Sequence, residues 1–128
     1  MKLPITLAVG VDLVKILRIE ALLAKPRGPR FLQRVLHSSE RVLLPSLSNE
    51  NRARYVSGCW ATKEAVYKTL PTAKQRKFTF SEWYRYLKDG IPCVGSDMLT
   101  DEEFKLSISH DDGLLIATVL RQRIVEIK

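Results

Sequence analysis

Two carboxylates and a lysine stand in sequence surroundings that suit chemistry on a phosphate. Asp12 follows Gly10 and Val11 at the end of an apolar, β-rich run, and Glu64 precedes Lys68 by four residues. Carboxylates without a neighbouring His or Cys suit a hard ion such as Mg²⁺, which typically binds one or two carboxylates together with substrate phosphates. Lys68 would then supply a positive charge for a phosphoryl group.

Each of these residues also has a purely structural explanation. Asp12 could cap a following helix, and Glu64 with Lys68 forms a favourable helix pair worth about 0.2–0.5 kcal/mol. His110 ends the alternating segment 106–110 on its apolar side, so it could be a partly buried structural histidine. The spacing alone leaves open whether Asp12 and Glu64 meet in space.

The residue patterns predict one α+β domain over residues 1–128, with a helical first half and a mainly antiparallel second half. Apolar residues that recur every three or four positions predict helices, whereas alternation and Asp-Gly turns predict strands. The expected elements are a buried strand over 5–12, a helix over 13–24, a short apolar stripe over 31–36, a long helix from Ser48 to about Leu70, and a hairpin of strands 105–110 and 114–121.

The composition is that of an ordinary globular protein with an excess of positive charge. Of 128 residues, 45% are hydrophobic and 27% are charged. Residues 1–64 hold 11 basic and 5 acidic side chains, which gives +6 of the total +7. This half should attract an anion, whether nucleic acid, a phosphate-rich small molecule, an acidic protein or a membrane surface. The segment 83–86 (WYRY) could form an aromatic and basic nucleic-acid surface, although strand packing is its commoner role.

The sequence predicts an intracellular protein without a transmembrane helix. The longest apolar run, residues 114–120, is far shorter than the roughly 18 residues that a membrane span needs. The first residues lack the regions of a signal peptide. Cys59 and Cys93 have neither CxxC spacing nor a His cluster, so we expect reduced thiols rather than a disulfide framework or a zinc site.

Three motifs occur in an order that is typical of one enzyme family. They are Gly-Val-Asp at 10–12, Trp-Ala-Thr-Lys-Glu-Ala-Val-Tyr-Lys at 60–68, and Ser-Ile-Ser-His at 107–110. Together they resemble the 4'-phosphopantetheinyl transferase superfamily, in the short single-domain type of holo-acyl-carrier-protein synthase. The separation of 52 positions from Asp12 to Glu64 fits that short type, and the resemblance covers nearly the whole chain.

The resemblance implies transfer of 4'-phosphopantetheine from coenzyme A to a serine of an apo acyl carrier protein, with release of adenosine 3',5'-bisphosphate. It implies that Asp12 and Glu64 bind Mg²⁺ at the pyrophosphate. Lys68 would contact the transferring phosphate, and His110 would help to hold the coenzyme. A carboxylate or a metal-bound water would take the serine proton, and Glu64 is the preferred candidate.

The resemblance also implies partners and a setting. Arg18, Arg30 and Arg34 would face the acidic carrier protein, which agrees with the charge of the first half. The short type implies a homotrimer with sites at subunit interfaces, and neither nucleic acid nor a membrane as a partner. Trp60 and the His-Asp-Asp-Gly turn are closer to the fungal mitochondrial branch, so the expected location is the mitochondrial matrix or the cytoplasm.

One departure from the family pattern supports an alternative function. Leu70-Pro71-Thr72-Ala73 stands where bacterial members have a Gly-Thr-Gly loop. A catalytically inactive relative that serves as an interaction module is therefore a second hypothesis. A small basic nucleic-acid-binding domain is a third, because of the net charge and the segment 83–86.

Overall fold

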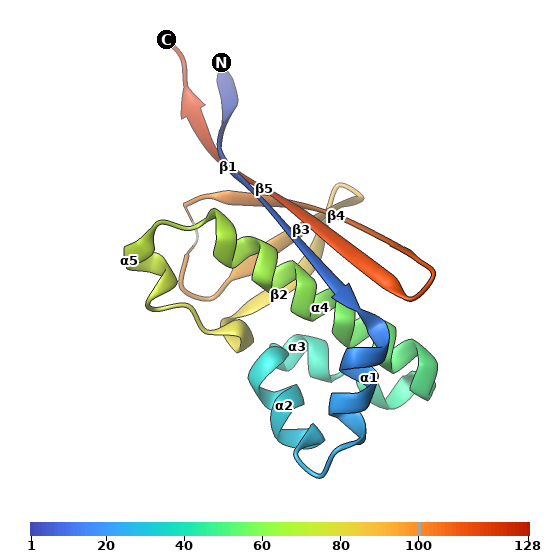
Figure 1. The fold of residues 1–128 in the computed structure, drawn as a ribbon. Coiled ribbons are helices and arrows are strands. Elements are labelled where there is room, and N and C mark those ends of the chain that lie inside the picture. The colour runs from blue at the N-terminus through green and yellow to red at the C-terminus, as the bar shows by residue number, and fades with distance from the viewer. Residues whose placement is uncertain (100) are drawn as a thin grey trace.

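Helices cover one face of a five-stranded antiparallel sheet in this computed structural model, which describes residues 1–99 and 101–128 (Figure 1). The strand order is β1-β5-β4-β3-β2. The α+β class expected from the sequence is confirmed. The elements are β1 (Lys2–Lys15), α1 (Ile16–Ala24), α2 (Gly28–Val35), α3 (Ser38–Arg41), η1 (Leu44–Ser46), α4 (Asn49–Thr69), α5 (Thr72–Gln75), η2 (Phe80–Glu82), β2 (Trp83–Lys88), β3 (Ile91–Ser96), β4 (Glu103–Asp111) and β5 (Leu114–Glu126).

Strand β1 is longer and more exposed than the buried strand expected over 5–12. It pairs with β5 along its length, and both run past the other strands until the two termini lie side by side (Figure 1). Val9, Val11 and Leu13 are 58%, 43% and 60% exposed. The expectation was wrong because α4 covers only one face of the sheet, so alternate residues of β1 point away from the core.

Helix α4 begins and ends where the sequence predicts. The Ser48 hydroxyl accepts a hydrogen bond of 3.3 Å from the Asn51 amide, which caps the first turn, and Pro71 follows the last turn. The helix lies against β1 and β5. Gly10 allows this approach, because a Cβ at that position would collide with the carbonyl oxygen of Ala65.

Both Asp-Gly turns form where the sequence predicts them, and each closes a tight hairpin, of which only the β4–β5 hairpin was predicted. Asp89 and Gly90 have φ of 53° and 77°, and Asp112 and Gly113 have φ of 51° and 77°. Positive φ at both central residues is the geometry that matches the twist of hairpin strands. Helix α1 begins only at Ile16, not at residue 13, because β1 continues its pairing with β5 up to Lys15.

The segment 83–86 begins β2 and packs partly within the fold, which is the commoner role of such a segment. Trp83 is 4% exposed, stacks on Phe78 at 5.4 Å and meets Phe104 edge-on at 5.1 Å. The Arg85 guanidinium lies 4.8 Å from the centre of the Tyr55 ring. Among the residues that the structure describes, no helix is long and apolar enough to cross a membrane.

Candidate active site

Lys68 connects α4 to β1 at the centre of the candidate site. Its ammonium group donates hydrogen bonds to the Asp12 carboxylate at 3.1 Å and to the Val11 carbonyl at 2.8 Å. Asp12 lies within β1 and does not cap α1, whose first turn receives no side-chain cap. The expectation that Asp12 could cap the following helix is therefore wrong, and Asp12 instead pairs across the fold with Lys68.

Glu64 lies one turn before Lys68 on α4 and is half-buried. Burial raises the pKa of the Glu64 carboxyl, and the negative charge of Asp12 raises it further, against the opposing charges of Lys68 and Arg18. Asp12 and Glu64 are thus close enough to repel each other. The structure brings Asp12, Glu64 and Lys68 into one site.

The donor set suits a magnesium ion that is shared with phosphate oxygens. In the described part of the chain, no three His, Cys, Asp or Glu side chains gather in a way that could hold a metal by themselves. Mg²⁺ usually takes one or two carboxylates and completes its shell with water and substrate phosphates. A divalent cation would also relieve the repulsion between Asp12 and Glu64, so these residues fit the ion that the motifs suggest.

His110 stands apart from the other three residues. It is exposed, so the expectation of a partly buried structural histidine was wrong. On the sheet it pairs with Leu115 of β5, whereas Asp12 pairs with Ala117 from the opposite edge of β5. Strand β5 therefore separates His110 from Asp12.

A cavity of about 310 Å³ lies beside His110 and carries further cationic side chains. Arg54 and Arg85 line it together with Tyr55, and Asp12, Glu64 and Lys68 do not. The sequence analysis did not single out these two arginines. The alternation of β2 could have identified Arg85, because it places Arg85 on the same face as Trp83 and hence toward α4.

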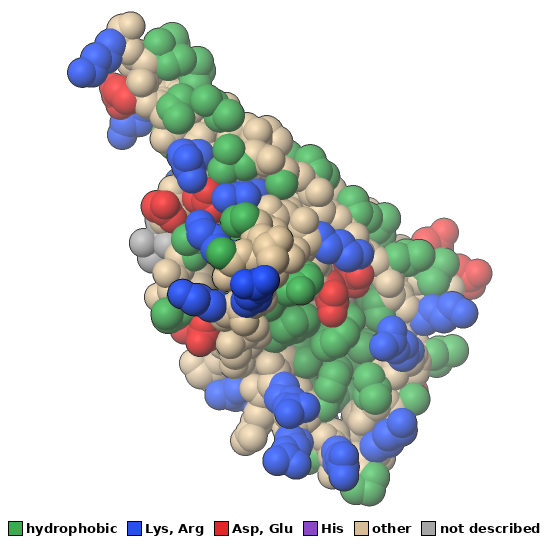
Figure 2. All heavy atoms as spheres, turned by 60° about the vertical axis from the view of Figure 1, so that its left-hand side comes forward, with side chains coloured by type: hydrophobic (Ala, Val, Ile, Leu, Met, Phe, Trp, Pro, Cys, Tyr) green, Lys and Arg blue, Asp and Glu red, His purple; other side chains and the backbone are tan. Residues whose placement is uncertain are grey.

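The three arginines predicted to face a carrier protein lie on exposed positions of α1 and α2. Arg18 is on α1, and Arg30 and Arg34 are on α2. Figure 2 shows Lys and Arg side chains gathered at the end of the molecule where these helices lie. The basic surface begins beside the site, because Arg18 already influences the pKa of Glu64.

A buried ion pair supports the helix that carries Glu64. Lys63 is fully buried, and its ammonium group donates to the Glu40 carboxylate at 2.6 Å and to the Val35 carbonyl at 2.5 Å. The other Glu40 oxygen accepts from the Arg85 amide at 3.3 Å. Burial lowers the pKa of Lys63, and the Glu40 charge opposes that shift. This pair ties α4 to α3 and β2.

Comparison with known proteins gives consistent matches along the chain. The family model of the 4'-phosphopantetheinyl transferase superfamily matches residues 8–119. A holo-acyl-carrier-protein synthase of Wolinella succinogenes is 35% identical over 122 residues, which cover 90% of this chain and 97% of the relative. A mitochondrial holo-acyl-carrier-protein synthase of Eremothecium gossypii is 30% identical over 136 residues, 88% of this chain and 77% of the relative.

A solved structure shows the same fold. The crystal structure of a holo-acyl-carrier-protein synthase from Bacillus anthracis, in complex with CoA (3',5'-ADP), matches with a TM-score of 0.78 at 27% sequence identity. The match covers 92% of this chain and 97% of that chain. The overall arrangement of helices and strands is therefore shared with a protein that holds this coenzyme.

Proposed function

This chain belongs to the 4'-phosphopantetheinyl transferase superfamily, and from that premise we propose that it is a holo-acyl-carrier-protein synthase, one transferase domain over residues 1–128. It transfers 4'-phosphopantetheine from coenzyme A to a serine of an apo acyl carrier protein. The observation that carries this proposal is the meeting of Asp12, Glu64 and Lys68 where α4 crosses β1.

The serine oxygen attacks the phosphorus that bears the pantetheine arm, and the bond to the other phosphate of the pyrophosphate breaks. The leaving group is adenosine 3',5'-bisphosphate. Glu64 takes the serine proton, because its carboxylate lies in the site beside Lys68, which would hold the transferring phosphate. Lys68 donates to the oxygens of the transferring phosphate, where negative charge develops.

Asp12 and Glu64 would hold Mg²⁺, which when bound neutralises charge on the pyrophosphate. Lys68 keeps the Asp12 carboxylate oriented through their hydrogen bond of 3.1 Å. The chain therefore holds the Asp12 carboxylate in place before any ion binds.

The cavity beside His110 suits the nucleotide end of the coenzyme. His110, Arg54 and Arg85 would face its phosphates, and guanidinium groups match phosphate oxygens in charge and in shape. The acidic carrier protein would dock on Arg18, Arg30 and Arg34, so that its serine reaches Glu64 from the basic side of the site.

The active assembly is a homotrimer whose interfaces cover the open face of the sheet. Val9, Val11 and Leu13 lie on that face, next to Leu114 and Ile116 of β5, and all five side chains are exposed in the single chain. A contiguous apolar surface of this kind favours a protein partner. Within one chain, β5 separates His110 from Asp12. A neighbouring copy would bring its own His110 to the site. The location is the mitochondrial matrix or the cytoplasm, because the similar proteins include bacterial synthases and a mitochondrial one.

The deciding experiment is the intact mass of an apo acyl carrier protein after incubation with this protein, coenzyme A and Mg²⁺. We expect a gain of one phosphopantetheine, and no gain when EDTA is present. Asp12→Ala and Glu64→Ala should abolish the gain while keeping the native circular dichroism spectrum, whereas Glu20→Ala, an exposed carboxylate on α1, should retain it.

The same experiment tests the inactive alternative, which rests on Pro71-Thr72-Ala73 in place of Gly-Thr-Gly. No mass gain with bacterial and mitochondrial carrier proteins, despite binding of the carrier, would favour an interaction module. Transfer by Glu64→Ala at the wild-type rate would refute the role given to that residue.

A further inference from the structure

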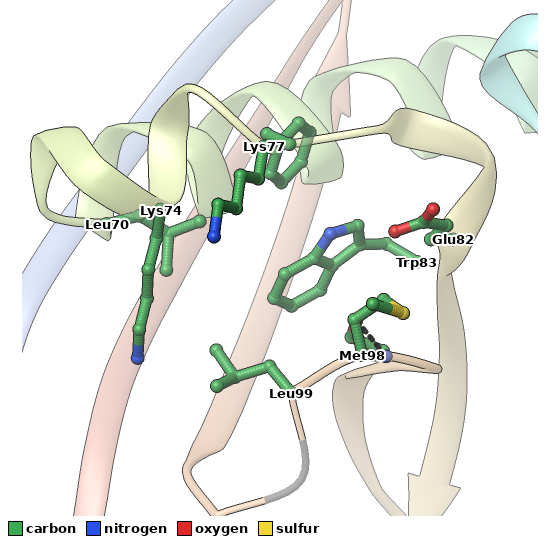
Figure 3. A pocket seen from close by; sticks show the side chains of 9 residues that line it. Leu70, Lys74, Lys77, Glu82, Trp83, Met98 and Leu99 are labelled. Atoms are coloured by element: carbon green, nitrogen blue, oxygen red, sulfur yellow. Dashed lines mark hydrogen bonds between the residues drawn. The ribbon is translucent and has the colours of Figure 1, made fainter.

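A second cavity, of about 260 Å³, lies beneath the segment that follows α4. Trp83, 4% exposed, forms its floor, and Leu70, Phe78 and Leu99 supply further apolar walls (Figure 3). Its volume is just below the roughly 300–1,000 Å³ typical of ligand pockets. None of Asp12, Glu64, Lys68 and His110 lines it, so it is separate from the proposed coenzyme site.

The charged side chains of this cavity are placed on opposite sides of the indole. Figure 3 shows the ammonium groups of Lys74 and Lys77 on the side of Leu70, and the Glu82 carboxylate beyond Trp83. A ligand that fits must therefore be apolar along most of its length and carry negative charge at the lysine end.

The lysine end has more positive charge than its carboxylate neighbours can balance. Lys74 lies 3.8 Å from Glu102, but Glu102 already accepts two hydrogen bonds of 2.9 Å from Arg121 and one of 3.0 Å from Arg123. Within the described residues, the Lys77 side chain has no hydrogen bond or ion pair. An anion placed between Lys74 and Lys77 would complete this arrangement.

We propose that this cavity binds an aliphatic carboxylate of medium chain length. The carboxylate group lies at Lys74 and Lys77, and the alkyl chain covers the Trp83 indole toward Leu99 and Met98. An alkyl chain gains the free energy of burying apolar surface, about 0.8 kcal/mol per CH₂. Inorganic phosphate would pair with the lysines but leave the apolar walls exposed to water. The apolar walls therefore favour a ligand with an alkyl chain.

Binding is tested by isothermal titration calorimetry of the full-length protein with octanoate, octan-1-ol and octylammonium. We expect one octanoate per chain, with octan-1-ol at least tenfold weaker and octylammonium weaker still. In Trp60→Phe, which leaves Trp83 as the one tryptophan of the sequence, octanoate should change the fluorescence with the same affinity.

Substitutions at the rim test the placement of the carboxylate without disturbing the core. Lys77→Gln should weaken octanoate by about tenfold, the effect of losing one charge-assisted hydrogen bond. Met98 is 75% exposed, so Met98→Glu should fold normally and weaken octanoate by placing a charge beside its alkyl chain, whereas Met98→Gln should change the affinity less than threefold. Lys128→Gln, at the exposed chain end, is the matched control and should leave binding unchanged.

Equal affinity for octanoate and octan-1-ol would overturn the proposal, and so would unchanged binding by the Lys74→Gln, Lys77→Gln double variant. Absence of saturable octanoate binding at millimolar concentration would overturn it as well. The measurement involves no group transfer, so it stands or falls independently of the proposed synthase activity.

Discussion

Two adjacent residues of α4, Lys63 and Glu64, point in different directions because the helix turns about 100° from one to the next. Lys63 points into the core and pairs with Glu40, whereas Glu64 points toward Asp12 in the candidate site. Burial acts on the pKa of both, lowering that of Lys63 and raising that of Glu64. One residue thus anchors the helix that presents the other.

Lys63→Met should destabilise the fold by about 3–5 kcal/mol, because it leaves the Glu40 carboxylate buried without its partner. Urea denaturation measures this loss. The double variant Glu40→Gln, Lys63→Met should recover a substantial part of it, since neither charge then remains buried. Lys68→Met is the matched control at a half-exposed lysine and should change the stability by less than about 1 kcal/mol. Equal stability of Lys63→Met and wild type would contradict the anchoring role.

At the scale of elements, the approach of α4 to β1 depends on Gly10. A methyl group there would collide with the backbone oxygen of Ala65, which has no rotamer by which to move aside. The strand that carries Asp12 and the helix that carries Glu64 would be pushed apart. The glycine of the Gly-Val-Asp motif is therefore a spacing element of the site.

Gly10→Ala should lower the free energy of unfolding by about 1–3 kcal/mol, the usual cost of overpacking, and should reduce phosphopantetheine transfer more than it reduces folded protein. Thermal denaturation and the mass assay measure the two effects. Gly90→Asn is the control, because Asn tolerates the positive φ of that turn and nothing lies near its Cβ. Wild-type activity in Gly10→Ala would show that the spacing is not critical.

The elements that local sequence determines were predictable. The Ser48 cap, the Pro71 stop and both Asp-Gly turns act through their own residues and neighbours. Strand β3 was missed because Pro92 and Gly95 interrupt its alternation. The exposure of β1 was misjudged because it depends on which sheet face the helices cover.

The site was only partly predictable, for a related reason. The motifs identify Asp12 and Lys68, but their hydrogen bond spans 56 positions and depends on how α4 crosses β1. The separation of His110 depends on β5 lying between β4 and β1. No local pattern distinguishes the buried Lys63 from the half-exposed Lys68.

For the whole molecule, the uncovered apolar face of β1 predicts assembly. Leu13→Glu should convert a trimer into a monomer and abolish transfer, because a charge cannot be buried at a tight apolar interface without a partner. Size-exclusion chromatography with light scattering measures the mass. Leu87→Glu changes a comparably exposed leucine, 71% against 60%, on the β2 hairpin and should leave the assembly intact. A monomeric wild type with full activity would rule out the trimer as the active form.

The position of β5 between β1 and β4 determines when the protein can fold during its synthesis. Of the five described strands β1 is made before the others, whereas its partner in the sheet, β5, is made after them. Until β5 has been made, β1 lacks the strand it pairs with, and its Val9, Val11 and Leu13 lie on the kind of edge that aggregates. Because the sheet can close only once β5 has been made, we expect the incomplete chain to aggregate more readily than the chain that includes β5.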